Sequence, residues 1–432
     1  MLTPPGTTLG TTLGTTPTPI DPHPAPSSRS AKSPPRRTPS RPTVTAPVAP
    51  RVARPIPATT ASREARAAPP TARRTPRRRV TAVAAIASGS APEGRAGDDG
   101  RLSPLSTPSA TRLVLEAHGI GTKYTLGQNF LVNDDVLKKI VALAEVGEAD
   151  RILEVGPGIG TLTIALLKHA ARVVAVERDP DLPAVLADTL HPWRDRFALI
   201  EKDALDLVAA DMAAPWPNKL VSNLPYAVAA TVVLDYFQQF PFVDSATVMV
   251  QKEVADRMAA ERGTKNYGAY TVKLGLYAEP AGRFTVGPGN FFPPPRVDSA
   301  VIRLNRRVPL MADGSPASPA VIAAAGLMAD AAFANRRKTL ANSCKTFFTG
   351  RGTIALALPA ETCPAAAAPH ASGASAPLAV DGPAAATQLP ALFEAAAVDP
   401  KRRGETLSQQ EFLSLGAALL ASDAMVYNVR LN

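Results

Sequence analysis

The segment Asn223-Leu224-Pro225-Tyr226 combines groups that could hold a flat base by its edge and by its face. An asparagine side chain supplies a carbonyl acceptor, and a proline redirects the chain so that backbone carbonyls point outward. Tyrosine supplies a ring on which a base can stack. Together these groups predict a clamp for a planar base that bears an exocyclic amine.

A glycine-rich segment, 154–162, places Gly156, Gly158 and Gly160 in a G-x-G-x-G spacing. Glycines at the turn from a strand to a helix let backbone N–H groups come close to a ligand. The spacing is not the G-x-G-x-x-G of dinucleotide-binding sites. By itself the loop indicates a cofactor that contains a nucleoside, and a plain tight turn is the alternative.

Two acidic residues, Glu177 and Asp203, follow apolar runs further along the chain. A carboxylate at Glu177 could accept hydrogen bonds from both hydroxyls of a ribose, which argues against a 2′-phosphorylated ligand. The alternative for Glu177 is a solvated loop acid. A carboxylate at Asp203 could accept a hydrogen bond from the exocyclic amine of an adenine.

Each of these motifs comes directly after a short apolar run, as a residue at the end of a buried strand would. Strands are expected at 152–155, 173–176, 198–200, 219–222 and 246–250, and helices at 162–167, 181–190 and 231–240. This alternation predicts an α/β fold, in which a parallel sheet carries helices on both faces. Since ligands bind at the carboxyl ends of such strands, the four motifs should meet there. Beyond Asn305, helices expected at 321–333, 336–348 and 408–420 would form a small C-terminal domain.

The first 110 residues differ in composition from the rest of the 432-residue chain. They hold 16 Lys and Arg against 5 Asp and Glu, so this tail carries a net +11 while the remaining residues carry −1. The tail holds none of the 22 aromatic residues, so it cannot bury enough apolar area to offset its ordering entropy. We therefore expect 1–110 to be disordered. Its Arg-rich, acid-poor composition fits an organelle transit peptide, a nucleic-acid-binding arm or a start codon assigned too far upstream.

Composition also excludes several classes of protein. Two cysteines, Cys344 and Cys363, cannot form a disulfide framework or a four-thiolate zinc site, and their sparseness suits a reducing compartment. No apolar run approaches the roughly 20 residues that span a bilayer. The five histidines are scattered, so no metal site is expected.

Charge is divided unevenly within the body of the chain. Residues 111–250 carry a net −6 and residues 251–350 a net +7, so a polyanion such as RNA should contact the second of these parts. The densest basic cluster there is Arg336-Arg337-Lys338, at an expected helix start, with Lys345 beyond it. Residues 401–403 are a second candidate. The alternative is a solvated helix face.

Six blocks of sequence occur in order over nearly all of 118–432. They are Leu126-Gly127-Gln128-Asn129-Phe130-Leu131, the glycine-rich segment, Asn223-Leu224-Pro225-Tyr226, Gln251-Lys252-Glu253-Val254, 290–301 and 333–340. On these blocks the chain resembles the rRNA adenine dimethyltransferase family, of the bacterial type that acts on small-subunit (16S) rRNA. The resemblance implies a Rossmann-like methyltransferase sheet and S-adenosylmethionine as cofactor. It also implies dimethylation of two adjacent adenosines near the 3′ end of that rRNA, with a role in small-subunit biogenesis.

The resemblance further implies roles for single residues. Those implied in cofactor binding are Asn129, Leu131, Gly156, Gly158, Glu177, Asp203 and Asn223. The catalytic set is implied to be Asn223, Leu224, Pro225 and Tyr226, which would hold the adenine, and Phe291, which would stack on its second face. For the neighbouring Phe292 we favour loop packing.

The implied domains are a disordered tail at 1–110, a methyltransferase domain at 111–304 and a helical rRNA-contacting domain at 305–432. The last would contain a low-complexity insertion at 355–386, which the family lacks. We expect a monomer that works on immature small-subunit particles, without a metal or a membrane. The resemblance to bacterial members favours the cytoplasm, and a transit peptide would instead place the protein in a plastid.

Three rival functions share parts of this pattern. A large-subunit rRNA methyltransferase of the drug-resistance type would share the pocket. A non-catalytic ribosome assembly or transcription factor would share the fold, and a DNA adenine methyltransferase would share the chemistry. The basic C-terminal part and the segment 291–299 favour the small-subunit enzyme.

Overall fold

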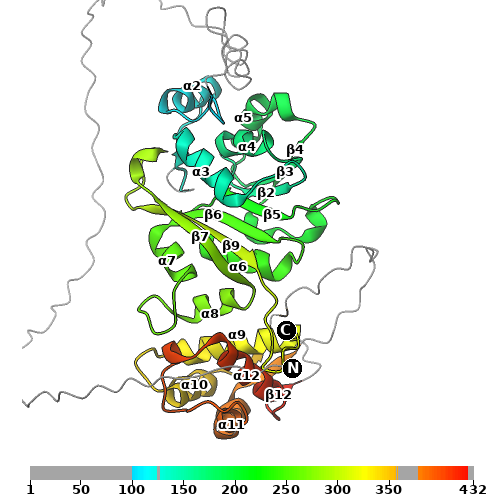
Figure 1. Ribbon diagram of the computed structural model, residues 1–432, viewed down its shortest axis with the longest axis vertical. Coiled ribbons are helices and arrows are strands. Elements are labelled where there is room, and N and C mark those ends of the chain that lie inside the picture. The colour runs from blue at the N-terminus through cyan, green and yellow to red at the C-terminus, as the bar shows by residue number, and fades with distance from the viewer. Residues whose placement is uncertain (1–99, 124–126, 357, 359–377, 427–432) are drawn as a thin grey trace, which may run out of the picture. The chain divides into compact units, whose positions relative to one another are not determined.

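The computed structural model describes residues 100–426, except 124–126, 357 and 359–377 (Figure 1). Residues 1–99, which are most of the tail expected to be disordered, therefore lie outside the described residues. The centre of the expected insertion lies outside them too. The described part contains a large sheet with helices on both faces, followed by a mainly helical C-terminal part. The α/β fold expected from the sequence is confirmed.

The large sheet has seven strands in the order β4-β3-β2-β5-β6-β9-β7. The five strands expected from the sequence are all present and run parallel: β2 (Arg151–Val155), β3 (Arg172–Glu177), β4 (Phe197–Glu201), β5 (Lys219–Asn223) and β6 (Ser245–Gln251). Two further strands, β7 (Ala278–Val286) and β9 (Ser299–Arg306), extend the sheet antiparallel to their neighbours. From β2 the chain first adds β3 and β4 on one side and then crosses to add β5 and β6 on the other side.

The large sheet lies between two apolar layers. Successive residues of β2 face opposite layers, so Ile152 packs in one core and Leu153 in the other. The first core contains α3 (Asp134–Ala144), α4 (Thr161–Leu167) and α5 (Leu182–Thr189), and the second contains α6 (Ala229–Gln239). Figure 1 shows these helices on the two sides of the sheet. Burial on both sides explains why the inner strands are continuous apolar runs.

Residues 100–110 are described and belong to the folded domain, so the expected boundary after residue 110 is wrong. Helix α2 spans Pro108–His118, and Leu105 in front of it is fully buried. The backbone N–H groups of Leu102 and Ser103 donate to the carboxylate of Asp134 at the start of α3, each at 3.1 Å. This segment is therefore held both by the burial of Leu105 and by hydrogen bonds to Asp134, which a composition without aromatic residues did not reveal.

The C-terminal part contains four helices and a small sheet within the described residues. The helices are α9 (Pro319–Phe333), α10 (Leu340–Thr349), α11 (Gly382–Ala395) and α12 (Gln409–Leu420), and the strands are β10 (Thr353–Ala355), β11 (Ala379–Asp381) and β12 (Met425–Val426). A further pair of helices, α7 (Lys252–Met258) and α8 (Ala269–Gly275), lies between the large sheet and α9 (Figure 1). None of the described helices is both long and apolar enough to cross a bilayer.

Helix α11 was not expected, because its sequence is rich in alanine and proline. The expected insertion at 355–386 therefore ends too late, since residues 379–386 form β11 and the first turn of α11. The Asp381 side chain accepts a hydrogen bond from the Ala384 N–H, which caps the helix start, and Pro383 lies in the first turn. Leu389 and Phe393 of this helix are buried in the core.

Helices α9 and α12 come so close that Gly416 has no space for a side chain. A Cβ placed on Gly416 would lie 2.6 Å from the Ala325 backbone nitrogen and 2.7 Å from the Val321 carbonyl oxygen. Gly416→Ala is therefore expected to lower the free energy of unfolding by about 1–3 kcal/mol, measured by urea denaturation. Gly352→Ala is the control, because a Cβ there meets nothing within 4 Å. Equal stability of the two variants would contradict this account of the α9–α12 contact.

Candidate functional site

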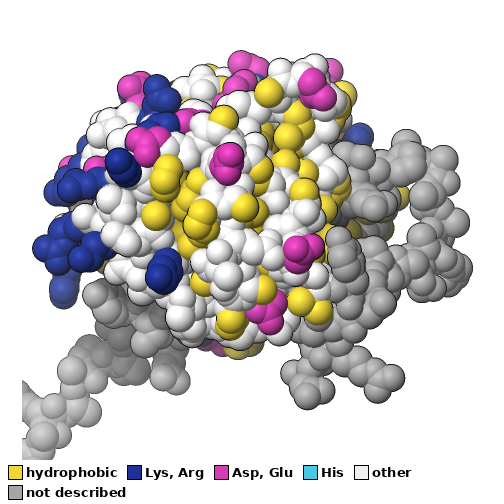
Figure 2. Space-filling view, turned by 90° about the horizontal axis from the view of Figure 1, so that it is seen from below, with side chains coloured by type: hydrophobic (Ala, Val, Ile, Leu, Met, Phe, Trp, Pro, Cys, Tyr) yellow, Lys and Arg dark blue, Asp and Glu magenta, His cyan; other side chains and the backbone are white. Residues whose placement is uncertain are grey.

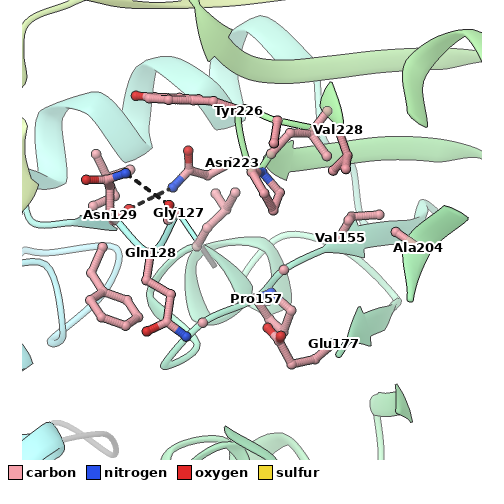
Figure 3. A pocket seen from close by; sticks show the side chains of 18 of the residues that line it. Gly127, Gln128, Asn129, Val155, Pro157, Glu177, Ala204, Asn223, Tyr226 and Val228 are labelled. Atoms are coloured by element: carbon pink, nitrogen blue, oxygen red, sulfur yellow. Dashed lines mark hydrogen bonds between the residues drawn. The ribbon is translucent and has the colours of Figure 1, made fainter. Parts of the chain in front are cut away.

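A cavity of about 820 Å³ opens at the carboxyl ends of the parallel strands (Figure 3). Val155 ends β2, Glu177 ends β3 and Asn223 ends β5, and all three line the cavity together with Asp203 just after β4. The four motifs found in the sequence are thus brought to one place. A cavity of this size falls within the range of pockets for small ligands.

The glycine-rich segment has a backbone that requires glycine. Gly156, Gly158 and Gly160 have φ angles of 68°, 61° and 90°, which L side chains adopt only with strain. A Cβ on Gly158 would also lie 3.1 Å from the ring of Phe130. Gly156 and Gly158 line the cavity, so a ligand can approach their backbone closely.

The carboxylate of Glu177 is largely buried and is fixed by the backbone that follows it. Its Oε1 accepts hydrogen bonds from the N–H groups of Arg178, at 2.9 Å, and Asp179, at 2.8 Å. Burial raises the pKa of Glu177 above its ordinary value, although the backbone hydrogen bonds oppose this shift. A solvated loop acid is therefore the wrong description of this residue.

Asp203 presents an ionised carboxylate to the cavity. Its Oδ1 accepts from the Leu205 N–H at 3.0 Å, and its Oδ2 pairs with the guanidinium of Arg178 at 2.8 Å. The Leu205 N–H and Arg178 together hold the pKa of Asp203 below its ordinary value. The ion pair with Arg178 was not foreseen, because it joins side chains from two neighbouring strand ends.

The side chain of Asn223 is oriented by a hydrogen bond to a segment far away in sequence. Its Nδ2 donates to the carbonyl oxygen of Asn129 at 3.2 Å, and the Asn129 side chain donates to the Gly127 carbonyl at 3.0 Å. Since the amide nitrogen is occupied, Oδ1 of Asn223 remains as an acceptor, and Figure 3 shows it on the side toward Tyr226. This is the acceptor that a base amine would need.

Tyr226 lines the cavity, and its hydroxyl is tied to a buried partner. The Tyr226 hydroxyl lies 2.6 Å from Oγ of Ser299, which is fully buried at the start of β9. This contact anchors the hydroxyl end of the ring. Leu224 and Pro225 complete the clamp at the cavity wall.

Phe291 is not among the residues that line the cavity in this ligand-free structure, and the stacking role implied for it stays a prediction. It belongs to a two-residue strand, β8 (Phe291–Phe292), which pairs with β1 (Phe130–Leu131). This pairing turns the Phe291 ring into the core, where it is only 3% exposed. The next segment, Pro293–Val297, lines the cavity instead. Phe292 packs under the guanidinium of Arg112, 4.8 Å from the ring centre, in agreement with loop packing.

The two remaining residues expected at the cofactor lie on the cavity wall. Asn129 and Leu131 both line it, Asn129 from the segment before β1 and Leu131 from β1 itself. Neither position had a physical signal of its own in the sequence, because what brings them there is the pairing of β1 with β8. Within the described residues, no group of three or more His, Cys, Asp or Glu is arranged to hold a metal ion.

Comparison with known proteins agrees with this geometry. Residues 121–357 match the family model described as ribosomal RNA adenine dimethylase. The chain belongs to this family. A relative from Geobacillus kaustophilus (strain HTA426), named ribosomal RNA small subunit methyltransferase A, is 35% identical over 322 residues. The match covers 73% of this chain and 97% of that relative.

Two further matches are similar in extent. A protein of the same name from Streptomyces griseus subsp. griseus is 38% identical over 315 residues, covering 72% of this chain and 94% of the relative. A crystal structure of a dimethyladenosine transferase from Plasmodium falciparum covers 66% of this chain and 95% of its own, with 21% identity and a TM-score of 0.49.

This member of the adenine dimethylase family has a further acid in its cavity that was not singled out from the sequence. Glu154 is only 1% exposed, and its Oε2 has no hydrogen-bond partner among the described residues. Burial raises the pKa of Glu154 to about 8; the Thr163 hydroxyl opposes the shift, and the nearby Glu177 adds to it. An acidic residue inside an apolar strand, directly before the glycine-rich segment, was the signal that could have revealed it.

The basic cluster of this family member lies in a turn, not at a helix start. Residues 334–338 separate α9 from α10, which begins only at Leu340 after its cap Thr339. Arg337, Lys338 and Lys345 are exposed. Arg336 is committed to other groups, because it pairs with Glu405 at 3.0 Å and donates to the Thr264 carbonyl at 3.0 Å.

Three loops of the C-terminal half meet around this turn. The Gly263 N–H donates to the Glu405 carbonyl at 2.9 Å, and the Leu340 N–H donates to the Arg402 carbonyl. The exposed cations of these loops, here called the basic surface, are Arg262, Lys265, Arg337, Lys338, Lys401 and Arg403. None of them forms an ion pair with another described residue. Figure 2 shows Lys and Arg side chains gathered along one edge of the molecule seen from below.

Proposed function

We propose that this chain dimethylates the exocyclic amines of two adjacent adenosines near the 3′ end of small-subunit rRNA, with S-adenosylmethionine as the methyl donor. It would act during small-subunit biogenesis, on the immature particle. The observation that carries the proposal is the Asn223 amide, whose nitrogen is occupied by Asn129 and whose oxygen faces the cavity beside Tyr226. Relatives that the chain matches over nearly their whole length bear the name of a small-subunit rRNA methyltransferase.

The residues at the glycine-rich end of the cavity fit the cofactor. The fixed carboxylate of Glu177 would accept from the ribose hydroxyls, and the ionised Asp203 would accept from the adenine amine. Gly156 and Gly158 would contact the cofactor through their backbone, and Asn129 and Leu131 from the opposite wall. When bound, the cofactor supplies a methyl group made electrophilic by a sulfonium.

The clamp prepares the adenine for transfer. The exocyclic nitrogen is a poor nucleophile, because its lone pair is delocalised into the ring. Hydrogen bonds from the amine to Oδ1 of Asn223 and to the Leu224 carbonyl would favour a pyramidal nitrogen, whose lone pair is less conjugated with the ring and is directed toward the methyl group. Stacking on Tyr226 would contribute roughly 1–3 kcal/mol to holding the base. Catalysis then rests on positioning and electrostatics. The nitrogen loses its proton only after methylation, so no strong base is required.

We also propose that the basic surface contacts the rRNA phosphates while an adenosine leaves its stack to enter the cavity. Lys345, on the exposed side of α10, would extend this contact, and Arg336 would act mainly by bracing the loops. We propose that the enzyme acts as a monomer. We place the enzyme in the cytoplasm; N-terminal sequencing of the native protein would reveal a removed transit peptide and so favour a plastid.

Removing two charges from the basic surface should weaken rRNA binding alone. Arg337→Gln with Lys338→Gln is expected to raise KM for small-subunit particles roughly tenfold and to lower the slope of log KM against log salt by about 1–2. Cofactor affinity and kcat should not change. The control is Lys139→Gln with Arg172→Gln, which removes the same charge from exposed sites in the cofactor-binding half. An equal effect of both double variants would argue against a local contact.

Transfer of a labelled methyl group tests the function directly. Immature small-subunit particles, naked rRNA, large subunits and DNA would be offered as substrates, and modified nucleosides identified by mass spectrometry. We expect dimethyladenosine only in small-subunit rRNA. Transfer to large-subunit rRNA or to DNA would favour a rival enzyme, and particle binding without any transfer would favour an assembly factor.

A further inference from the structure

A buried carboxylate outside the cavity, Asp179, holds the segment that orients the base clamp. This segment, here called the strap, consists of residues 122–123 and 127–129. Asp179 is only 2% exposed. It accepts hydrogen bonds from Nζ of Lys123 at 2.5 Å and from Nε2 of Gln128 at 2.6 Å. Asp179 follows β3, so these bonds join the strap to the loop that begins with Glu177.

Gln128 uses both ends of its amide in this contact. While its Nε2 donates to Asp179, its Oε1 accepts from the Lys123 backbone N–H at 2.9 Å. Lys123 in turn reaches a second carboxylate, Asp181, at 2.6 Å. Burial opposes ionisation of Asp179, yet the Lys123 ammonium, the Asp181 N–H and the Gln128 amide together hold its pKa below the ordinary value. The strap is therefore fixed by an ion pair and by an amide whose oxygen and nitrogen both form hydrogen bonds.

The residues that hold the strap are also bonded to two residues of the functional site, Glu177 and Asn223. At one end, the Asp179 backbone N–H donates to Oε1 of Glu177 at 2.8 Å. At the other end, the strap carbonyl of Asn129 accepts from Nδ2 of Asn223 at 3.2 Å. A path of hydrogen bonds and chain segments thus runs from the cofactor acid, through Asp179 and Gln128, to the amide of the base clamp. Asp179 itself does not line the cavity.

We propose that Asp179, bonded to Lys123 and to the cavity-lining Gln128, positions the reaction: it holds the strap so that Asn223 presents its oxygen to the target amine. This inference rests on the proposed function. It makes the second methyl transfer the more sensitive step. An unmodified amine has two N–H groups that can find an acceptor, whereas a monomethylated amine has one, so a loosely held Asn223 should fail more often with the second substrate.

Isosteric and neutral replacements test the role. Asp179→Asn and Lys123→Met are each expected to lower kcat on immature small subunits about tenfold, with KM for the particle unchanged. The ratio of monomethyl- to dimethyladenosine, from nuclease digestion and mass spectrometry, should rise. Because both variants break the ion pair between Asp179 and Lys123, the loss of kcat in the double variant should be smaller than the two single losses combined. Lys123→Arg should restore the wild-type product ratio.

A binding measurement separates this proposal from the proposed function. Asp179→Asn should weaken binding of S-adenosylmethionine to the free protein about threefold to tenfold in calorimetry, because the Asp179 carboxylate holds Gln128, which lines the cavity beside Asn129. Lys138→Met is the matched control, since it breaks an ion pair with Asp134 on α3, away from the strap. Absence of transfer by the wild-type chain would overturn the proposed function alone. A wild-type product ratio in both strap variants, or cofactor binding as tight as in the control, would overturn the positioning role.

Discussion

Replacing Asn223 with alanine is expected to lower kcat on small-subunit particles by about 10²–10³, the loss typical when one preorganised hydrogen-bonding group is removed from an active site. The variant loses the carbonyl oxygen that receives the target amine, and the nucleophile is then no longer turned toward the methyl group. Cofactor binding should be spared, because the Glu177 and Asp203 carboxylates are held by their own backbone contacts. Rates under single-turnover conditions and calorimetry with S-adenosylmethionine would measure the two effects separately.

The matched control lies at the other end of the same strand. Asn218 stands just before β5, and its Oδ1 accepts from the Arg151 N–H while its Nδ2 donates to Asp150. Asn218→Ala therefore removes a structural asparagine far from the cavity and is expected to lower stability while kcat stays near that of the wild type. Full activity of Asn223→Ala would refute the clamp role, and an equal loss of kcat in both variants would show that the effect is structural.

The parts of the fold that could be predicted from the sequence are those fixed by local burial. Strands β2, β3, β5 and β6 are apolar because both faces of the sheet are covered, so each was visible as an apolar run. The edge strand β7 was not, because Pro280 and Gly282 interrupt it and it contains a register shift between them. Its pairing with β9 is decided by tertiary contacts that no local pattern records.

In the candidate site, too, some residues could be predicted from local sequence and others depend on tertiary contacts. Glu177, Asp203 and Asn223 could be found because each stands at the end of a strand, and the order of parallel strands brings such ends together. The conformation of Phe291 could not, because the two-residue pairing of β8 with β1 joins segments 160 positions apart and turns the ring into the core. The Asp179–Gln128 bond likewise depends on a contact between remote side chains.

Glu154→Gln is expected to remove a loss of stability that the wild-type protein undergoes as the pH rises. The ordinary pKa of this side chain is 4.5, and burial raises it to about 8 in the folded protein. Between these values the folded state keeps a proton that the unfolded state has released. Because the unfolded state then binds fewer protons, the free energy of unfolding falls with rising pH across this window and becomes level above about pH 8.

Integrated over the window, the effect is on the order of 5 kcal/mol. Glutamine has the same shape and stays neutral, so the variant should match the wild type near pH 4.5 and become the more stable of the two toward pH 8. Urea denaturation of the cofactor-free proteins at constant ionic strength, in steps across this range, would give the difference directly and cancel the titrations that both proteins share. Parallel curves would show that Glu154 is ionised in the folded protein, and its unpartnered Oε2 would then require a bound cation or water to satisfy it.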